Sequence, residues 1–298
     1  IKIEARNVIQ KFSSANELHG FPGLSIANER GDRAFIARQG AQVLSWQTHD
    51  GKERLYLSAL SGGMRRGDRD DAIAQPIRGG IPVCFPQFSG RGPLLKHGFA
   101  RAFPWSGTAD SAGVPATLKL RDQDHTRKIW PHAFDAETTV TLEPDRLVVA
   151  LSVTNRDSTP WAFTAALHTY LRTDDIRNVQ LQGLQNVRYE DATAANALSV
   201  QQEKDLRIGG ELDRVYLSPP RELLLLENGA PSLRIAQQGF EDTVVWNPGP
   251  DNARALADFP DEDWLRMLCV EAACVATPVL LQPGESWEGR QLLTVAGS

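Results

Sequence analysis

The 298-residue sequence predicts an all-β protein, built as a sandwich or a barrel of short strands. Glycine (24 residues) and proline (18 residues) interrupt the chain along its whole length, and runs rich in β-forming residues lie between them. Few segments sustain the period of a helix. Because no flexible linker and no repeat of fixed period divides the chain, we expect residues 1–298 to form one large domain.

The clearest strand pattern lies near the middle of the chain. In residues 134–142 (FDAETTVTL), one face is mainly apolar and the other is acidic or threonine, and the two alternate residue by residue, which is typical of a half-buried strand. The mainly apolar face consists of Phe134, Ala136, Thr138, Val140 and Leu142. Glu143, Pro144 and Asp145 predict a turn, and residues 147–153 (LVVALSV) predict the returning strand of an antiparallel hairpin. Further strands are predicted at residues 42–46, 162–167, 179–182, 233–236, 243–246, 267–270, 279–282 and 291–295, a turn at 155–160, and a short helix at 252–259.

The charge balance argues against two classes of partner. The chain carries 32 Lys and Arg against 37 Asp and Glu, a net charge of −5, whereas nucleic acids and anionic membranes select a basic face. The sequence shows neither a signal-peptide pattern nor an aliphatic run approaching the roughly 20 residues of a membrane helix. We expect no nucleic-acid and no membrane partner, and we expect a monomer. The charged segment 65–71 (RRGDRDD) is predicted to be a solvated loop.

The cysteines and the common motifs exclude further classes. Cys84, Cys269 and Cys274 are too few and too scattered for a disulfide scaffold or a zinc knuckle, which favours a reducing compartment, the cytoplasm. The histidines lack the spacing of a helical zinc site. The nucleotide-binding patterns GxGxxG and GxxxxGKS/T and the hydrolase pattern GxSxG do not occur. These observations argue against a bound metal, a bound nucleotide and a serine hydrolase of that class.

The densest group of candidate functional residues lies in one proline-rich segment. Arg78, Lys96, His97 and Arg101 are interleaved there with aromatic residues, and Gly79-Gly80 permits a tight backbone geometry. Arginine forks onto a carboxylate or a phosphate, and lysine supplies a point charge. The segment therefore predicts either an anion-binding site or a loop with ordinary surface charges.

Three more residues are candidates because of their surroundings. His168 ends an apolar run, where a histidine is either a satisfied core residue or a functional imidazole. Glu271 lies inside an apolar β run, so its carboxylate must be paired or have a raised pKa. It is either half of a structural ion pair or a general base tuned by burial. Asp213 is interpreted only as an acid that precedes a strand.

Taken in order, these segments resemble the hexose-6-phosphate mutarotases (glucose-6-phosphate 1-epimerases), a branch of the aldose 1-epimerase superfamily. The resemblance extends from about residue 40 to residue 271, and six blocks in the order of the family carry it. These blocks are RGGIPVCF at 78–85, HGFAR at 97–101 with PW at 104–105, HTYL at 168–171, DRVY at 213–216, TVVWNP at 243–248 and CVE at 269–271.

The resemblance implies a large antiparallel β-sandwich of the galactose-mutarotase type, acting on a small-molecule sugar phosphate without a metal or an organic cofactor. It implies that His168 is the general acid and Glu271 the general base. It also implies that Arg78 and Arg101 bind substrate and phosphate.

The remaining binding residues follow from the same resemblance. Asp213 matches an acid that binds sugar hydroxyls, and His97 matches a histidine in or beside the sugar pocket. Lys96 stands where many relatives carry glutamine, so it keeps a hydrogen-bond donor and adds a charge. That substitution leaves open whether Lys96 contacts the sugar or the phosphate.

The implied chemistry needs only an acid and a base. The base takes the proton of the anomeric hydroxyl and the acid protonates the ring oxygen. The ring then opens, and rotation about one bond exposes the other carbonyl face before closure. Such a pair typically contributes about 10²–10⁴-fold. We expect Glu271 to be ionised and His168 to be protonated in the productive state, and a nearby phosphate dianion favours the charged imidazole.

Three alternatives remain open at the level of sequence. A mutarotase for unphosphorylated aldoses needs no cationic cluster. A non-catalytic carbohydrate-binding sandwich needs an aromatic platform, for which Trp105 or Trp246 would serve, and no acid–base pair. A sugar lyase or glycosidase is also compatible with such a fold; a glycosidase requires two carboxylates flanking the bond, for which the chain offers Asp213 with Glu271.

Overall fold

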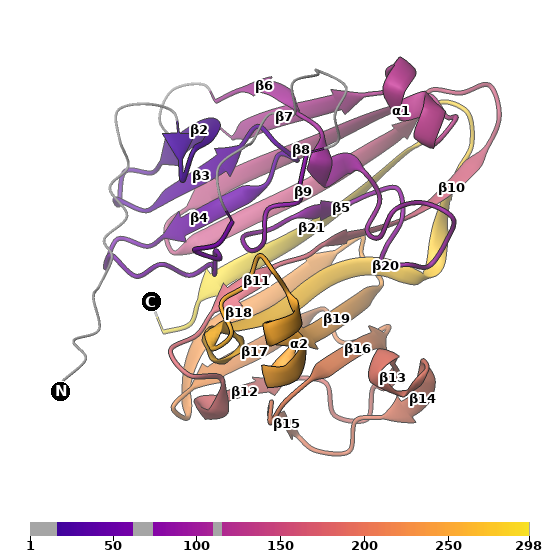
Figure 1. Ribbon diagram of the computed structural model, residues 1–298. Coiled ribbons are helices and arrows are strands. Elements are labelled where there is room, and N and C mark those ends of the chain that lie inside the picture. The colour runs from indigo at the N-terminus through magenta and orange to yellow at the C-terminus, as the bar shows by residue number, and fades with distance from the viewer. Residues whose placement is uncertain (1–16, 62–73, 110–114, 298) are drawn as a thin grey trace.

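The predicted all-β fold is confirmed by the computed structural model, which describes residues 17–61, 74–109 and 115–297 (Figure 1). In these ranges the strands form three antiparallel sheets. The charged segment 65–71 lies outside the described residues. Among the helices of the described ranges, none is both long enough and apolar enough to cross a membrane.

The smallest sheet is a meander made by the first strands of the chain. Its order follows the sequence: β1 (Glu17–Leu18), β2 (Phe21–Ala27), β3 (Arg33–Ala37) and β4 (Val43–Gln47). Antiparallel neighbours need only short connections, which is why consecutive strands lie side by side. The strand predicted at residues 42–46 corresponds to β4.

The largest sheet contains the predicted hairpin. Strands β8 (Phe134–Glu143) and β9 (Arg146–Asn155) pair along their whole length, and the turn at Pro144-Asp145 places Asp145 in the left-handed region, with φ 55°. The order of this sheet is β15 (Asp205–Leu206), β12 (Val179–Gln182), β17 (Glu222–Glu227), β18 (Ala230–Gln238), β21 (Ser286–Val295), β9 (Arg146–Asn155), β8 (Phe134–Glu143), β7 (Ala116–Arg121) and β6 (Ser106–Thr108).

The third sheet carries two of the candidate functional residues, Asp213 and Glu271, and His168 directly follows one of its strands. Its order is β14 (Ala197–Val200), β13 (Arg188–Asp191), β16 (Leu212–Leu217), β19 (Asp242–Asn247), β20 (Met267–Leu281), β10 (Trp161–Leu167) and β5 (Val83–Cys84), and β11 (Tyr170–Arg172) also pairs with β20.

Strand β20 corrects one prediction, because the strands expected at 267–270 and 279–282 are parts of one strand. Pro278 lies between the two predicted segments. In the structure the pairing with β10 jumps from Phe163–Val279 to Ala165–Cys274, so Pro278 lies beside a bulge. A proline is tolerated there because the ladder is already interrupted.

The helical segments are short, and their prediction was only partly right. The helix expected at residues 252–259 is α2 (Gly249–Ala255), which begins earlier and ends at Leu256 in an extended conformation. Helix α1 (Asp124–Ile129) was not predicted, although Gln123 and Thr126 form a capping box at its start. The remaining helical turns are η1 (Ala100–Ala102), η2 (Ile176–Asn178), η3 (Ala192–Ala194) and η4 (Asp263–Arg266).

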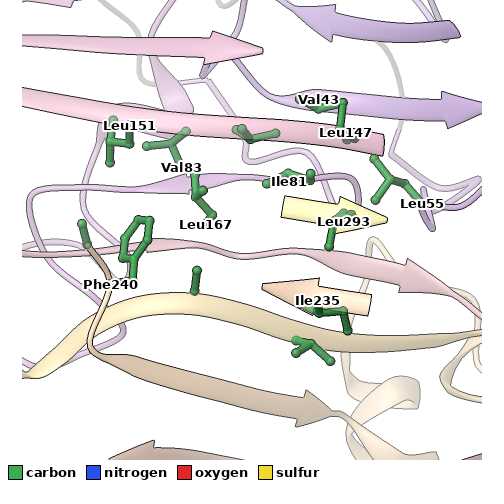
Figure 2. Packing of buried hydrophobic residues seen from close by; sticks show 14 of the residues in the cluster. Val43, Leu55, Ile81, Val83, Leu147, Leu151, Leu167, Ile235, Phe240 and Leu293 are labelled. Carbon is green, nitrogen blue, oxygen red and sulfur yellow. The ribbon is translucent and has the colours of Figure 1, made fainter. Parts of the chain in front are cut away.

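The two large sheets pack face to face, which makes the fold a sandwich (Figure 2). Along β9 every second side chain is buried, beginning with Leu147, Val149 and Leu151. These side chains meet Val83 and Leu167 of the third sheet in one hydrophobic cluster. The alternation leaves the opposite face of the third sheet free to carry polar groups.

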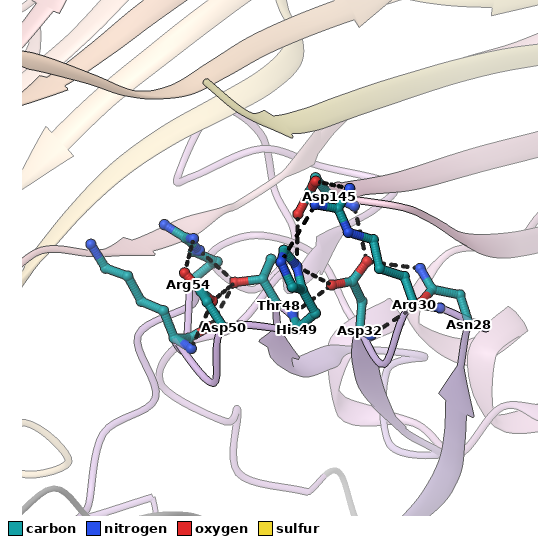
Figure 3. A network of polar contacts seen from close by, with 9 residues as sticks. Asn28, Arg30, Asp32, Thr48, His49, Asp50, Arg54 and Asp145 are labelled. Carbon is teal, nitrogen blue, oxygen red and sulfur yellow. Dashed lines mark hydrogen bonds and ion pairs between the residues drawn. The ribbon is translucent and has the colours of Figure 1, made fainter. Parts of the chain in front are cut away.

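A buried polar network joins the small sheet to the β8–β9 turn (Figure 3). Asp32 Oδ1 accepts a hydrogen bond from the backbone N–H of His49 at 2.6 Å, and Oδ2 accepts from Asn28 Nδ2 at 2.8 Å and from the backbone N–H of Asp145 at 2.9 Å. Asp145 in turn pairs with Arg30 at 2.5 Å and with His49 Nδ1 at 3.2 Å. Burial raises the pKa of Asp32, but these hydrogen bonds outweigh it and hold the pKa below its usual value.

We predict that Asp32→Asn lowers the free energy of unfolding at neutral pH by about 3 kcal/mol, because one buried amide cannot accept all three hydrogen bonds. Since the folded pKa of Asp32 lies below its unfolded value, the deficit should shrink as the pH falls through that folded pKa. Urea unfolding across pH measures both effects. The control is Glu241→Gln, which removes an exposed ion pair with Arg221. A deficit no larger than that of the control would contradict the prediction.

Candidate active site

All seven residues singled out from the sequence line one cavity of about 350 Å³. This volume lies within the usual range of small-molecule sites. The seven are Arg78, Lys96, His97, Arg101, His168, Asp213 and Glu271. The fold therefore brings together side chains that are spread from residue 78 to residue 271.

The third sheet supplies the acidic side of the pocket. In β20, Val270 and Ala272 belong to the core between the sheets, so Glu271 points to the opposite face, where the cavity lies. Asp213 lies on the same face of β16, separated from β20 by β19. The interpretation of Asp213 as an acid preceding a strand was wrong, because pairing with β19 already begins at Leu212.

His168 lies between β10 and β11, which both pair with β20. The backbone N–H of His168 donates to the carbonyl of Pro82 at 2.9 Å. The predicted glycine pair fits another close approach, to the backbone at residues 43 and 56: Gly79 and Gly80 have φ of 119° and 61°, and a Cβ at Gly80 would lie 2.1 Å from the Val43 oxygen. Only glycine fits such a position without displacing the neighbouring backbone.

His168 and Glu271 form the centre of the site. His168 Nδ1 lies 3.3 Å from Glu271 Oε1, and the two side chains are 9% and 1% exposed. Within the described residues, neither His168 Nδ1 nor Glu271 Oε2 has a hydrogen-bond partner. Buried polar atoms are normally satisfied, so an unpartnered pair that lines a cavity is suited to contact a ligand.

Burial moves both groups toward their neutral forms. It raises the pKa of Glu271 well above the usual value, and the charge of Asp213 adds to this rise. It lowers the pKa of His168 well below the usual value, helped by Arg101 and Arg78. For each group alone this is opposite to the ionised form expected from the sequence. Both arrangements carry one titrating proton on the pair, so they have the same net charge.

His97 presents a neutral imidazole beside this pair. Its Nδ1 accepts from the backbone N–H of Ser89 and lies 3.3 Å from Cys84 Sγ. Burial, and then the positive surroundings, hold the pKa of His97 far below its usual value. Because Nδ1 acts as acceptor, the ring hydrogen lies on Nε2, which has no protein partner among the described contacts and is available as a donor.

The three cations of the pocket are held differently. Arg78 forks onto Asp258, with Nη2 at 3.1 Å from Oδ1, and donates to the Tyr170 hydroxyl at 3.3 Å. Arg101 donates to the backbone carbonyl of Lys96 at 2.8 Å. No carboxylate of the described ranges lies within ion-pair distance of Lys96 or Arg101. Their charges are therefore available to an anionic ligand.

The sequence did not point to some of the residues that line the cavity, and it left the role of others undecided. Asp258 follows α2 in a segment with no motif, so nothing pointed to it. Tyr170 lay inside the HTYL block but received no role. Of the two candidate aromatic platforms, Trp246 lines the cavity, whereas Trp105 is 1% exposed in the core and donates to the Ala100 carbonyl.

Among the described residues, two groups of side chains have donor atoms close enough to hold a metal ion, with the donor atoms of each group within 4.8 Å of one another. In the first, His168, Cys269 and Glu271, the cations of the pocket oppose binding of another cation. In the second, Asp32, His49 and Asp145, the carboxylates already accept hydrogen bonds or pair with arginine. We assign a metal to neither group.

Residues 22–294 match the sequence profile of the family described as aldose 1-epimerase. The chain belongs to this family. As an aldose 1-epimerase family member it is an isomerase of the epimerase, or mutarotase, class.

Curated relatives share much of the sequence of this epimerase. A Cenchrus ciliaris protein with the provisional name glucose-6-phosphate 1-epimerase is 36% identical over 280 residues, covering 89% of this chain and 82% of its own. An Escherichia coli protein with the same provisional name is 32% identical over 248 residues, covering 81% and 79% of the two chains.

Solved structures confirm the galactose-mutarotase type of fold. A provisionally named mutarotase from Salmonella typhimurium is 28% identical, with a TM-score of 0.82 over 94% of this chain and 92% of its own. A galactose mutarotase related enzyme from Lactobacillus acidophilus is 16% identical, with a TM-score of 0.73 over 92% and 97% of the two chains, and shows the shared fold.

We predict that Asp213→Asn lowers the pKa of Glu271, because the Asp213 carboxylate raises it by repulsion. Carbon-13 NMR of labelled glutamate carboxyl groups measures the titration. The control is Asp205→Asn, an acid that accepts a hydrogen bond from Gln182 and does not line the cavity. An unchanged or higher pKa of Glu271 in Asp213→Asn would show that the two acids do not interact.

Proposed function

We propose that this epimerase interconverts the α and β anomers of a hexose 6-phosphate, most readily glucose 6-phosphate. The observation that supports this substrate is the presence of cationic side chains beside the acid–base pair. Lys96 and Arg101, which have no carboxylate partner in the described structure, line the same cavity as His168 and Glu271. A neutral sugar requires no such charges, whereas a phosphate dianion does. The provisional names of the curated relatives agree with it.

In the proposed reaction Glu271 is the general base and His168 the general acid. Glu271 takes the proton of the anomeric hydroxyl while His168 protonates the ring oxygen, the C–O bond breaks, and an open-chain aldehyde forms. After rotation about the C1–C2 bond the ring closes on the other carbonyl face, and each group reverses its role. Because the two side chains lie 3.3 Å apart on adjoining segments of one sheet, both can reach oxygens bonded to the same carbon.

The substrate dianion also favours the productive protonation state. Burial and the cations disfavour the imidazolium of His168 in the unliganded pocket. A bound phosphate offsets the charges of Lys96 and Arg101, so it raises the pKa of His168 toward the form that acts as an acid. Phosphate binding and acid catalysis thus support each other.

The other pocket residues bind the sugar and the phosphate in this proposal. Arg78, Lys96 and Arg101 surround the phosphate. His97 donates through Nε2 to a sugar oxygen, and Asp213 accepts from sugar hydroxyls. Burial raises the pKa of Asp213 to about 6, so this acceptor is fully ionised only above that pH.

Stopped-flow polarimetry with glucose 6-phosphate and with glucose tests whether the enzyme prefers the phosphorylated sugar. We predict that Arg101→Met and Lys96→Met each raise KM for glucose 6-phosphate by about 10–100-fold, because each removes a charge-assisted contact to the phosphate. The kcat/KM for glucose should change much less. The control is Arg234→Met, which breaks an exposed pair with Glu222 away from the cavity. Equal losses on both sugars would contradict the phosphate assignment and favour a mutarotase for unphosphorylated aldoses.

A further inference from the structure

Tyr170 connects two parts of the pocket that have separate proposed roles. Its side chain is buried, at 3% exposure, and lines the cavity. Its ring stacks on the imidazole of His168, with centroids 4.8 Å apart and an angle of 11° between the planes. Its hydroxyl oxygen accepts a hydrogen bond from Arg78 Nη1 at 3.3 Å. One side chain therefore contacts both the proposed acid and a proposed phosphate-binding arginine.

The contact with Arg78 is oriented by a third residue. Asp258 occupies the Nε and Nη2 edge of the guanidinium at 3.1–3.3 Å, which leaves Nη1 for the tyrosine. This fork fixes the plane of the guanidinium, because a planar bidentate pair has one favourable geometry. A displacement of Arg78 toward a ligand must therefore act on the hydroxyl of Tyr170.

The hydroxyl hydrogen of Tyr170 is free to contact a substrate. A guanidinium only donates, so Arg78 cannot accept this hydrogen, and no described residue accepts it. Burial raises the pKa of Tyr170 above its usual value, so the group stays a phenol. The phenol thus offers a donor to a substrate oxygen in the cavity.

We propose that Tyr170 is a positioning residue that transmits binding of an anion at Arg78 to the orientation of His168. The proposal rests on the proposed function, since it assigns the anion to the substrate phosphate. The stacked ring holds the imidazole in one plane, and its π face stabilises the imidazolium when the acid is charged. The hydroxyl sets the position of that ring relative to Arg78.

A purely structural role makes a different prediction. Tyr170 also packs beside Tyr56, with ring centroids 6.4 Å apart, in a buried cluster with Phe259. If packing were its whole contribution, substitution would lower the thermal stability without a specific effect on His168. The test therefore needs variants that separate the ring from the hydroxyl.

Tyr170→Phe keeps the ring and removes the hydroxyl, whereas Tyr170→Leu removes both. We expect Tyr170→Phe to raise KM for glucose 6-phosphate about tenfold, because a hydrogen bond to a charged group is lost, with a smaller fall in kcat. We expect Tyr170→Leu to lower kcat by a further factor of about 10–100, because His168 loses its support. The control is Tyr216→Phe, which removes another buried hydroxyl, bonded to Gln201 at 2.9 Å outside the cavity.

A second measurement does not depend on turnover. Inorganic phosphate is titrated into protein with nitrogen-15-labelled histidine, and the ring signals of His168 are followed by NMR. In the wild type and in Tyr216→Phe, phosphate should shift these signals. In Tyr170→Phe the shift at saturating phosphate should fall by at least about half, because the link to Arg78 is broken.

The outcomes separate this proposal from the proposed function. An unchanged His168 response in Tyr170→Phe, or wild-type kcat in Tyr170→Leu, would overturn the role of Tyr170. If the wild type failed to accelerate anomerisation, the proposed function would fall, yet the phosphate titration would still show whether Arg78 and His168 are coupled through Tyr170.

Discussion

The burial of one carboxylate is the constraint on which the rest of the site depends. Glu271 is 1% exposed in the middle of a strand that is paired on both sides. An isolated charge at such a place is costly, so the protein must either neutralise it or surround it with compensating groups. Here the carboxylate lies 3.3 Å from His168 Nδ1, and Lys96 and Arg101 lower its pKa from a distance while burial and Asp213 raise it. The same balance that makes Glu271 tolerable makes it a base that can be tuned by a ligand.

The sandwich fold accommodates the buried carboxylate because its sheets are rigid and because successive side chains of a strand alternate between the core and the cavity. One face of the third sheet is packed against β9 and its neighbours, and the other face presents Asp213 of β16, Val244 and Trp246 of β19 and Glu271 of β20 to the cavity. The strands fix the spacing of Asp213, Trp246 and Glu271, and the pairing of β10 and β11 with β20 places His168 beside Glu271. Sites built on strands hold their geometry more closely than sites on loops.

Much of this could be predicted from the sequence, for identifiable reasons. The β8–β9 hairpin was predicted because its alternation is local. Six of the seven pocket residues were predicted because they lie in motifs that occur together in one family, and Lys96 directly precedes one of these motifs. The continuity of β20 was missed because a bulge accommodates Pro278, and α1 because its capping residues are weak signals. Asp258 and the link through Tyr170 depend on contacts between segments about 90 to 180 residues apart, which no local pattern encodes.

The central claim, that Glu271 and His168 together move the protons of anomerisation, is tested most directly by NMR magnetisation exchange between the anomers of glucose 6-phosphate. Wild type and Glu271→Gln are compared at equal concentration, with equal thermal unfolding midpoints as the condition for comparison. The account predicts exchange well above the buffer rate for the wild type and a loss of at least about 10²-fold in the variant. Exchange at the buffer rate with wild type, or full acceleration by Glu271→Gln, would contradict it.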